Sequence, residues 1–390
     1  MSISPEDITS HRIKCSTTEI PISSRFCVPM AFNIGNIRSQ IIFHFTYVSA
    51  TVLGNYAREG TTVLATYDPS YVESGSVLWS NLTSCVVMGM LQELNSAKWF
   101  APSDLKSFFT VLTTGFCGAY SSYSTLMLET FQQSTSLSPS NIKNHTKLPN
   151  RAFGMKEFLA VLLTQLFTSM GAYLFGRGLS KSIIVPLTSN KNIVQSDQNE
   201  EEDKQAMVEN TGLVPKPWVQ KMVRFYQWSL ALLAIPFVAT ILVLTLVYGN
   251  YSRGKWTLFA LFGIFGGYLR YYLSNWCNGW IKNFPMGTFI ANELAVILIA
   301  CFQIILRGRK NYHEQRPVAH TVNSCHVTTS LVSGFCGSLS TISTFINEAY
   351  KLEFNYMLIY YFVTISVSYS LLVVIMGSYS WTRGLTIPMC

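Results

Sequence analysis

Apolar residues gather in nine long segments along the chain, with polar stretches between them. An α-helix rises about 1.5 Å per residue, so an apolar segment of roughly 18 residues can cross the ~30 Å hydrocarbon core of a bilayer. The segments cover residues 26–47, 77–91, 108–131, 158–175, 228–248, 256–273, 286–306, 326–352 and 356–378. The pattern predicts an all-α integral membrane protein with nine transmembrane helices.

The composition agrees with this class of protein. Charged residues make up 12% of the chain and apolar residues 49%, which is typical of a multi-pass membrane protein. Loop lysines and arginines account for the net charge of +8, so we expect contacts with the lipid bilayer and none with nucleic acid. The nine cysteines lack the spacing of a metal site or a disulfide framework, and we expect them to be small core residues.

A glycine- and hydroxyl-rich motif occurs twice, each time inside an apolar segment. Residues 115–126 read GFCGAYSSYSTL, and residues 334–345 read GFCGSLSTISTF. Two glycines and a run of hydroxyls disfavour a continuous helix, so each copy should break its helix and expose backbone polar groups. In a membrane, such backbone is tolerated only where it is buried in protein or lines a polar path. The motif therefore predicts a pathway for a small polar solute.

Three further pairs of polar residues occupy similar places in the two halves of the chain. Asn81 matches Asn292, Glu129 matches Glu348, and Arg38 matches Arg270. The differences in residue number are 211 for the asparagines, 219 for the glutamates and the glycine motifs, and 232 for the arginines. Offsets that change only across loops indicate duplicated four-helix domains, each with a broken third helix.

The number of crossings predicts how the repeats are related. Four crossings return a chain to its starting side, so one extra helix between two repeats makes them inverted. We predict a polar tail (1–25), a first domain (26–180), a polar linker (181–224), a linking transmembrane helix (225–249), a second domain (250–380) and a C-terminal tail (381–390). The charge counts of the loops conflict, so they predict no absolute orientation.

The polar residues inside apolar segments are the candidates for function, because they are unfavourable in lipid unless paired or hydrated. Asn81 and Asn292 either join helices or contact the solute. Arg38 and Arg270 either anchor to headgroups and ion pairs or attract an anion. Glu129 and Glu348 favour structural hydrogen bonding or pairing with the arginines, with proton coupling as the alternative. Hydroxyls suit either sign of ion, and they are abundant at Ser124, Thr125, Ser343 and Thr344.

These motifs resemble the fluoride channels and exporters called Fluc, CrcB or FEX. The resemblance rests on Gly-Phe-Cys-Gly followed by Ser-Thr-x-Ser-Thr-Phe, preceded by Gly287-Thr288-Phe289-Ile290-Ala291-Asn292 and, earlier, by Gly-x-x-x-Arg. It covers both halves, and the two-domain layout with a linking helix is similar to the eukaryotic FEX type.

The resemblance implies a passive, fluoride-selective anion channel between two antiparallel domains fused in one chain. Such a protein would act as a monomer in the plasma membrane, exporting fluoride and protecting the cell from its toxicity. No phosphate-binding loop, paired carboxylates or HExxH motif is present in the sequence, so we expect no organic cofactor, no catalytic residues and no enzyme. The alternative is a proton-coupled secondary transporter of another small solute that uses Glu129 or Glu348.

The resemblance also assigns the residues that line two ion paths. The family's pore phenylalanines correspond to Tyr123 and Leu126 in the first half and to Ile342 and Phe345 in the second. One path then pairs Tyr123 with Phe345, and the other pairs Leu126 with Ile342 and has no aromatic ring. We predict one working pore, served by Asn81 or Asn292, and one degenerate pore.

A structural sodium ion between the broken helices is a further implication of the resemblance. In the family, backbone carbonyl groups bind this ion. The corresponding carbonyls belong to Gly118, Ser121, Gly337 and Ser340.

Overall fold

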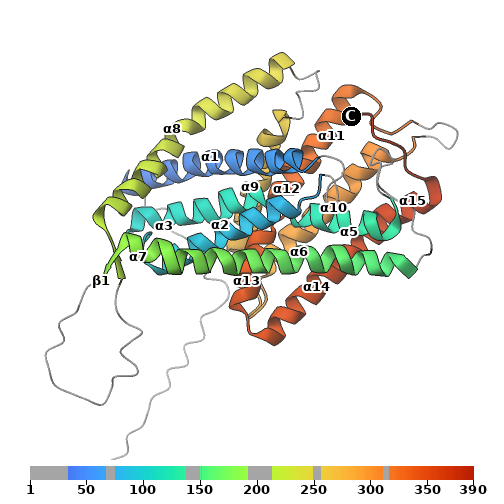
Figure 1. Ribbon diagram of the computed structural model, residues 1–390. Coiled ribbons are helices and arrows are strands. Elements are labelled where there is room, and N and C mark those ends of the chain that lie inside the picture. The colour runs from blue at the N-terminus through green and yellow to red at the C-terminus, as the bar shows by residue number, and fades with distance from the viewer. Residues whose placement is uncertain are drawn as a thin grey trace, which may run out of the picture.

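The computed structural model describes residues 34–66, 75–137, 150, 152–191, 213–248, 256–310 and 316–390 (Figure 1). It is an all-α protein to which two three-residue strands are added. Those strands, β1 (Ser189–Lys191) and β2 (Leu213–Pro215), pair antiparallel with Ser189 opposite Pro215. They bring the start of the long helix that follows next to the end of the first half.

The first half of the chain forms four consecutive helical segments. The first two are single helices, and the third is interrupted within the glycine motif. The elements are α1 (Ile34–Leu64), α2 (Leu78–Ser96), α3 (Ser103–Thr110), the π-helical η2 (Val111–Cys117), α4 (Gly118–Tyr120), α5 (Tyr123–Thr135), α6 (Ala152–Leu179), η3 (Ser180–Ile184) and α7 (Val185–Thr188).

The second half repeats this order after one additional helix, α8 (Pro217–Tyr248). The elements are α9 (Leu258–Cys277), α10 (Met286–Arg307), α11 (Val322–Ser330), η6 (Leu331–Cys336), α12 (Gly337–Leu339), α13 (Ile342–Lys351), α14 (Phe354–Leu372), η7 (Val373–Gly377) and α15 (Ser378–Arg383). As expected from the sequence, the third segment of each half is broken.

Both breaks fall at the hydroxyl residues and not at the glycines. Ser121 and Ser122 are extended between α4 and α5, and Ser340 and Thr341 are extended between α12 and α13. The side chain of Ser122 accepts the backbone N–H of Thr125 and so caps α5, as Thr341 caps α13. In each break, the residue that ends one helix, Ser121 or Ser340, is therefore followed directly by the residue that caps the next.

The helices have the length and the surface of a membrane protein. Five are long and apolar enough to cross a bilayer within the described ranges: Ala152–Thr188, Pro217–Val247, Met286–Arg307, Val322–Lys351 and Phe354–Arg383. Large apolar side chains on α6, α8 and α14 point outward, among them Phe167, Leu246 and Phe362. Such a surface is typical of helices that face lipid.

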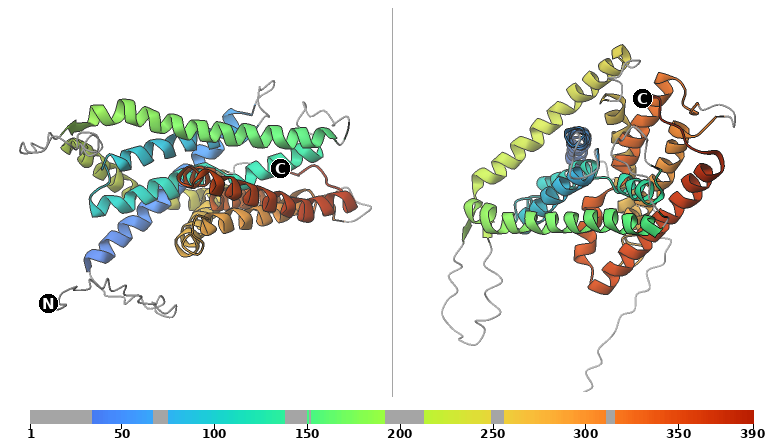
Figure 2. Two further views of the ribbon diagram at one scale, coloured as in Figure 1. Left: turned by 90° about the horizontal axis from the view of Figure 1, so that it is seen from below. Right: turned by 45° about the vertical axis from the view of Figure 1, so that its right-hand side comes forward.

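One apolar core joins the two halves. Tyr123 and Leu126 of α5 belong to the same buried cluster as Ala295 of α10 and Ile342 and Phe345 of α13. The helix α8 packs beside α1 at the rim of the bundle, and α6 runs the length of the bundle in both views of Figure 2. The breaks consequently meet in the interior, between the two halves.

The structure corrects two expectations about the ends of the chain. The first long helix covers Ile34–Leu64 and not 26–47, because its polar positions face other helices instead of solvent. The predicted tail 1–25 and the acidic run at 200–203 lie outside the described residues. Cys325 and Cys390 form a disulfide, whereas we expected unpaired core cysteines.

Candidate functional site: the crossing of the broken helices

The two breaks contact each other through reciprocal hydrogen bonds. The backbone N–H of Ser124 donates to Ser340 Oγ at 3.0 Å, and that of Ser343 donates to Ser121 Oγ at 3.1 Å. The Oγ of Ser124 reaches the carbonyl oxygen of Cys336, and in the same way Ser343 reaches that of Cys117. Contacts exchanged in this way are typical of elements related by a two-fold axis. The hydroxyls of Ser124 and Ser343 thus join the two halves.

Thr125 and Thr344 contact residues of their own half and not of the other half. Thr125 Oγ1 lies 2.8 Å from Ser122 Oγ, and Thr344 Oγ1 lies 3.4 Å from Thr341 Oγ1. Each threonine therefore belongs to the cap of its own half-helix. Of the hydroxyls predicted at the pore, these two keep partly buried side chains.

The two asparagines hold the breaks in place, one in each half. Asn81 Oδ1 accepts the backbone N–H of Ser122 at 2.9 Å, and Asn292 Oδ1 accepts that of Thr341 at 2.9 Å. The amide nitrogens differ. Asn81 Nδ2 donates to Gln165 Oε1 at 3.2 Å, whereas Asn292 Nδ2 is buried and has no partner among the described residues. Of these two asparagines, Asn292 alone keeps a buried donor without a partner among the described residues.

Arg270 on α9 lies at the place where the two helix breaks meet, which we call the crossing of the broken helices, and it is 1% exposed. Its Nη1 donates to the carbonyl oxygens of Gly118 at 2.7 Å and Ser340 at 3.2 Å, and Nη2 donates to that of Thr114. A Cβ atom at Gly118 would overlap the guanidinium, so glycine is needed for this close approach. The arginine links carbonyls of both halves.

The counterpart of Arg270 in the first half is Arg58, which the sequence comparison missed. Arg58 on α1 is 4% exposed and donates to the carbonyl oxygens of Ala119 and Ser333, while a Cβ atom at Gly337 would overlap it. The sequence signal is the spacing Gly-x-x-x-Arg, which Gly54 and Arg58 share with Gly266 and Arg270.

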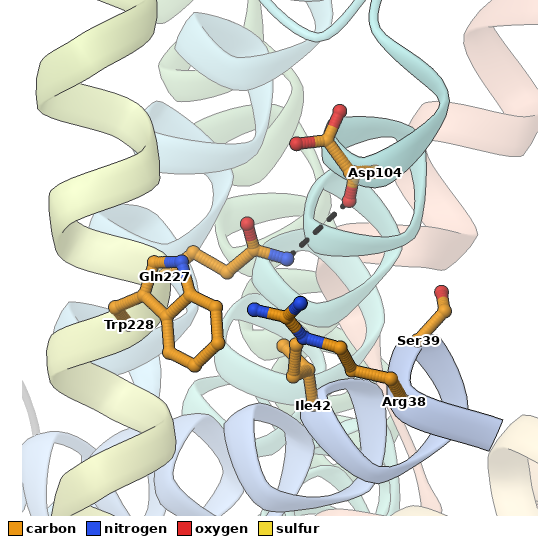
Figure 3. Close-up of a pocket in the computed structure, with 6 residues that line it drawn as sticks. All are labelled: Arg38, Ser39, Ile42, Asp104, Gln227 and Trp228. Atoms are coloured by element: carbon orange, nitrogen blue, oxygen red, sulfur yellow. Dashed lines mark hydrogen bonds between the residues drawn. The ribbon is translucent and has the colours of Figure 1, made fainter. Parts of the chain in front are cut away.

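Arg38, which we had matched with Arg270, lies away from the crossing. It borders a cavity of about 310 Å³ between α1, α3 and α8 that Ser39, Ile42, Asp104, Gln227 and Trp228 also line (Figure 3). Its guanidinium carbon lies 5.5 Å from the centroid of the Trp228 ring. The pairing of Arg38 with Arg270 is therefore wrong, because α1 places Arg38 about five and a half turns before Arg58 along the same helix.

The two glutamates hold the beginnings of helices. Glu129 accepts the backbone N–H of Val77 at 2.8 Å and Gln165 Nε2 at 2.8 Å, at the start of α2. Glu348 accepts the Thr288 hydroxyl at 2.8 Å, at the start of α10. Their contacts are the structural hydrogen bonds expected from the sequence, and both arginines of the crossing bind carbonyl oxygens instead.

Tyr123 and Phe345, the two aromatic residues of one predicted path, contact each other. We call this pair, with one residue from each half, the aromatic diagonal, and Leu126 with Ile342 the aliphatic diagonal. The ring centroids of Tyr123 and Phe345 are 5.4 Å apart, and the Phe345 ring also lies 4.8 Å from that of Tyr360 on α14. The Tyr123 hydroxyl lies 3.1 Å from Ser368 Oγ. Tyr360 and Ser368 were not among the predicted residues, although their spacing of eight puts both on one face of α14.

The other diagonal has no ring at the corresponding positions. Leu126 and Ile342 are aliphatic and completely buried in the same core. The two sides of the crossing are therefore alike in backbone and different in side chains.

The carbonyls predicted to hold sodium suit a hard cation, since they are neutral oxygen donors. Those of Gly118 and Ser340 already accept hydrogen bonds from Arg270. A carbonyl oxygen has two lone pairs, so one remains on each of these atoms for an ion. The donor set fits sodium if the ion shares these two oxygens with the guanidinium.

Comparisons with known proteins agree with this architecture. The family model described as CrcB-like protein, Camphor Resistance (CrcB), matches residues 45–176 and again residues 257–378. The chain is 47% identical to Fluoride export protein 1 and to Fluoride export protein 2 of Saccharomyces cerevisiae over 377 residues, which is 93% of this chain and 100% of each relative. It is 32% identical to Fluoride export protein 1 of Candida albicans, over 87% of this chain and 80% of that one. No solved structure matches the chain.

Proposed function

Because the chain belongs to the CrcB-like family, it exports fluoride, and we propose that the ion leaves passively through one selective path between the two halves. The path runs along Tyr123 and Phe345, with Asn292 as the amide donor. The observation that carries this proposal is the buried, unpartnered Nδ2 of Asn292 beside the helix break, in the part of the chain that the structure describes. A buried donor without a partner is unfavourable unless a ligand accepts a hydrogen bond from it.

The second path is degenerate in this proposal. The donor of Asn81 is already bound by Gln165, and Leu126 and Ile342 offer no ring edge to an anion. Fluoride is strongly hydrated, so a path without donors cannot replace its water. The aliphatic side remains a packed core.

The two halves are inverted repeats, and α8 is the extra crossing that inverts the second. The reciprocal contacts of Ser121, Ser124, Ser340 and Ser343 support this relation, as does the recurrence of the same helix order after α8. One chain then supplies both sides of the interface and acts as a monomer.

A passive path in the plasma membrane suffices for export. Hydrogen fluoride is neutral and crosses lipid, then dissociates inside the cell and leaves the anion trapped. An inside-negative potential drives a monovalent anion outward with about 2.3 kcal/mol per 100 mV. The apolar outer surface of α6, α8 and α14 would contact the bilayer.

A sodium ion would stabilise the crossing in this account. The carbonyls of Gly118, Ser121, Gly337 and Ser340 would hold it, and it would add positive charge between the two halves without entering the path. The Arg270 guanidinium already binds the carbonyls of Gly118 and Ser340, so the four oxygens would have to offset its repulsion of the ion.

Vesicles that contain the purified protein, are loaded with potassium fluoride and hold sodium on both sides of the membrane test the function. With a potassium ionophore present, fluoride should leave without a pH gradient, and chloride should not. Efflux that requires an imposed proton gradient would instead indicate a proton-coupled transporter. Chloride efflux without fluoride efflux would contradict the assignment of the ion.

A further inference from the structure

Glu293 on α10 is a buried acidic side chain connected to the Tyr123–Phe345 pair. It is 7% exposed, and its Oε1 accepts a hydrogen bond from Ser368 Oγ at 2.7 Å. The Ser368 hydroxyl has a single hydrogen, which it uses to donate to Glu293. The Tyr123 hydroxyl is therefore the donor in its 3.1 Å contact with Ser368. A chain of hydrogen bonds therefore leads from the Tyr123 ring to this carboxyl group.

The second oxygen of the carboxyl group is free. Glu293 Oε2 is buried and has no hydrogen-bond partner among the described residues, and the same holds for Nδ2 of the preceding Asn292. Two consecutive residues of α10 thus each keep one polar atom without a partner in the interior. Atoms of this kind are rare in folded proteins unless a ligand or water binds them.

No described residue neutralises a negative charge on Glu293. The helices that pack against α10 carry Arg270 on α9, Glu129 on α5 and the buried His326 on α11, and α14 carries tyrosines but no charged residue. Arg270 is bound to three carbonyl oxygens, and Glu129 to Val77 and Gln165. The polar groups connected to Glu293 by hydrogen bonds are therefore the hydroxyls of Ser368 and Tyr123, which are neutral.

An ionised carboxylate at this place is unfavourable for two reasons. A buried charge without a counter-ion loses its hydration and gains nothing in return. It would also repel an anion beside Tyr123 and Phe345. A neutral carboxylic acid avoids both problems, because Oε1 still accepts from Ser368 while a proton on Oε2 makes that atom a donor.

The repeats differ at this position in the direction expected for one working path. Asn292 is followed by Glu293, whereas Asn81 is followed by Leu82. The acid therefore occurs only in the half whose asparagine has a free donor.

We propose that Glu293 is a neutral carboxylic acid whose Oε2–H donates a hydrogen bond to a small anion in the Tyr123–Phe345 path. It follows Asn292 along α10 and supplies a second donor to the path, and an O–H group suits fluoride better than larger, weaker acceptors such as chloride. This role rests on the function proposed above.

Three variants in fluoride-loaded vesicles test the proposal. Glu293→Gln keeps a neutral donor and should conduct within about threefold of the unchanged protein, while Glu293→Leu removes the donor and should lose about tenfold or more of the flux. Leu82→Gln makes the matched change in the other half and should leave flux unchanged. Flux is divided by the amount of protein that elutes as a single folded species.

Infrared spectroscopy of the same proteins reports the proton directly. The carbonyl band of Glu293 as a protonated carboxylic acid should be present in the spectrum of the unchanged protein at neutral pH minus that of Glu293→Gln, in which any band from Glu129 or Glu348 cancels. A missing band overturns the proposal, as does equal loss of flux in the Gln and Leu variants, or normal flux in Glu293→Leu. If the band is present and the unchanged protein carries no fluoride, the proposed function fails and the neutral acid stands.

Discussion

The rings of Tyr123 and Phe345 lie 5.4 Å apart at an interplanar angle of 49°, although one belongs to each half of the chain. Their counterparts by sequence, Ile342 and Leu126, are aliphatic. The backbone of the crossing is thus nearly symmetric, and its aromatic side chains are not. The chemical difference in this protein therefore lies between the two diagonals of the crossing and not between the two halves of the chain.

The asparagines should respond differently to the same substitution. Asn292→Asp keeps the oxygen that accepts the backbone N–H of Thr341 and removes the free donor, so fluoride efflux should fall about tenfold. Asn81→Asp keeps the bond to Ser122, and its lost donor binds only Gln165 and the break itself. Both variants bury one new carboxyl group, so efflux is divided by the amount of folded protein. On that scale it should remain near normal for Asn81→Asp, and equal losses would argue against a single path.

Arg58 should matter for stability far more than Arg38 on the same helix. Arg58→Ala leaves buried carbonyl oxygens of Ala119 and Ser333 without their donor, which should lower stability by about 3 kcal/mol or more. Arg38 is exposed near the start of α1 and lies over the Trp228 ring, so Arg38→Ala should change stability by less than about 1 kcal/mol. The temperature at which the folded monomer is lost in size-exclusion chromatography compares the two. Similar temperatures would exclude a structural role for Arg58.

Removal of sodium tests whether the crossing needs an added cation. Replacing sodium by N-methylglucamine on both sides of the vesicle membrane should abolish fluoride efflux, and returning sodium should restore it. Potassium serves as the control for ionic strength. Efflux that is the same with and without sodium would mean that the guanidinium groups of Arg58 and Arg270 hold the carbonyls without an ion.

The Cys325–Cys390 disulfide predicts which end of the protein faces out of the cell. Disulfides form in oxidising compartments, so the end with the C-terminus should lie outside the cytosol. With nine crossings, the linker between β1 and β2 then lies in the cytosol. An epitope tag after Cys390 should bind antibody on intact cells, and the same tag between β1 and β2 should bind only after permeabilisation. The opposite pattern would reverse the orientation.

The sequence was sufficient for the helix breaks and for the asparagines that hold them. The breaks lie at the hydroxyls of the repeated motif, and the asparagines meet these breaks, because the same local chemistry occurs twice. The first helix was misjudged. Its polar residues around Arg58 have the composition of a loop, and only the packing of α1 against α9 and η2 shows that they face inward.

Other parts of the site are missed when the repeats are matched only within the predicted helices, or have no counterpart to match. Arg58 and Arg270 differ by 212 in residue number, close to the 211 of the asparagines, whereas Arg38 requires 232. This offset favours Arg58, but it gains weight only once the helix is known to continue beyond residue 47. Glu293 has no counterpart in the first half, so a search for shared residues discards it. The partners of Cys325 and Ser368 depend on tertiary contacts alone.

The most direct test of a single fluoride path is efflux from vesicles that contain Phe345→Ile or Ile342→Ala, per folded protein. Phe345→Ile removes one ring of the Tyr123–Phe345 pair and should reduce fluoride efflux about tenfold, whereas Ile342→Ala changes only the aliphatic diagonal and should stay within about twofold of normal. Comparable losses of efflux in the two proteins would contradict the single path.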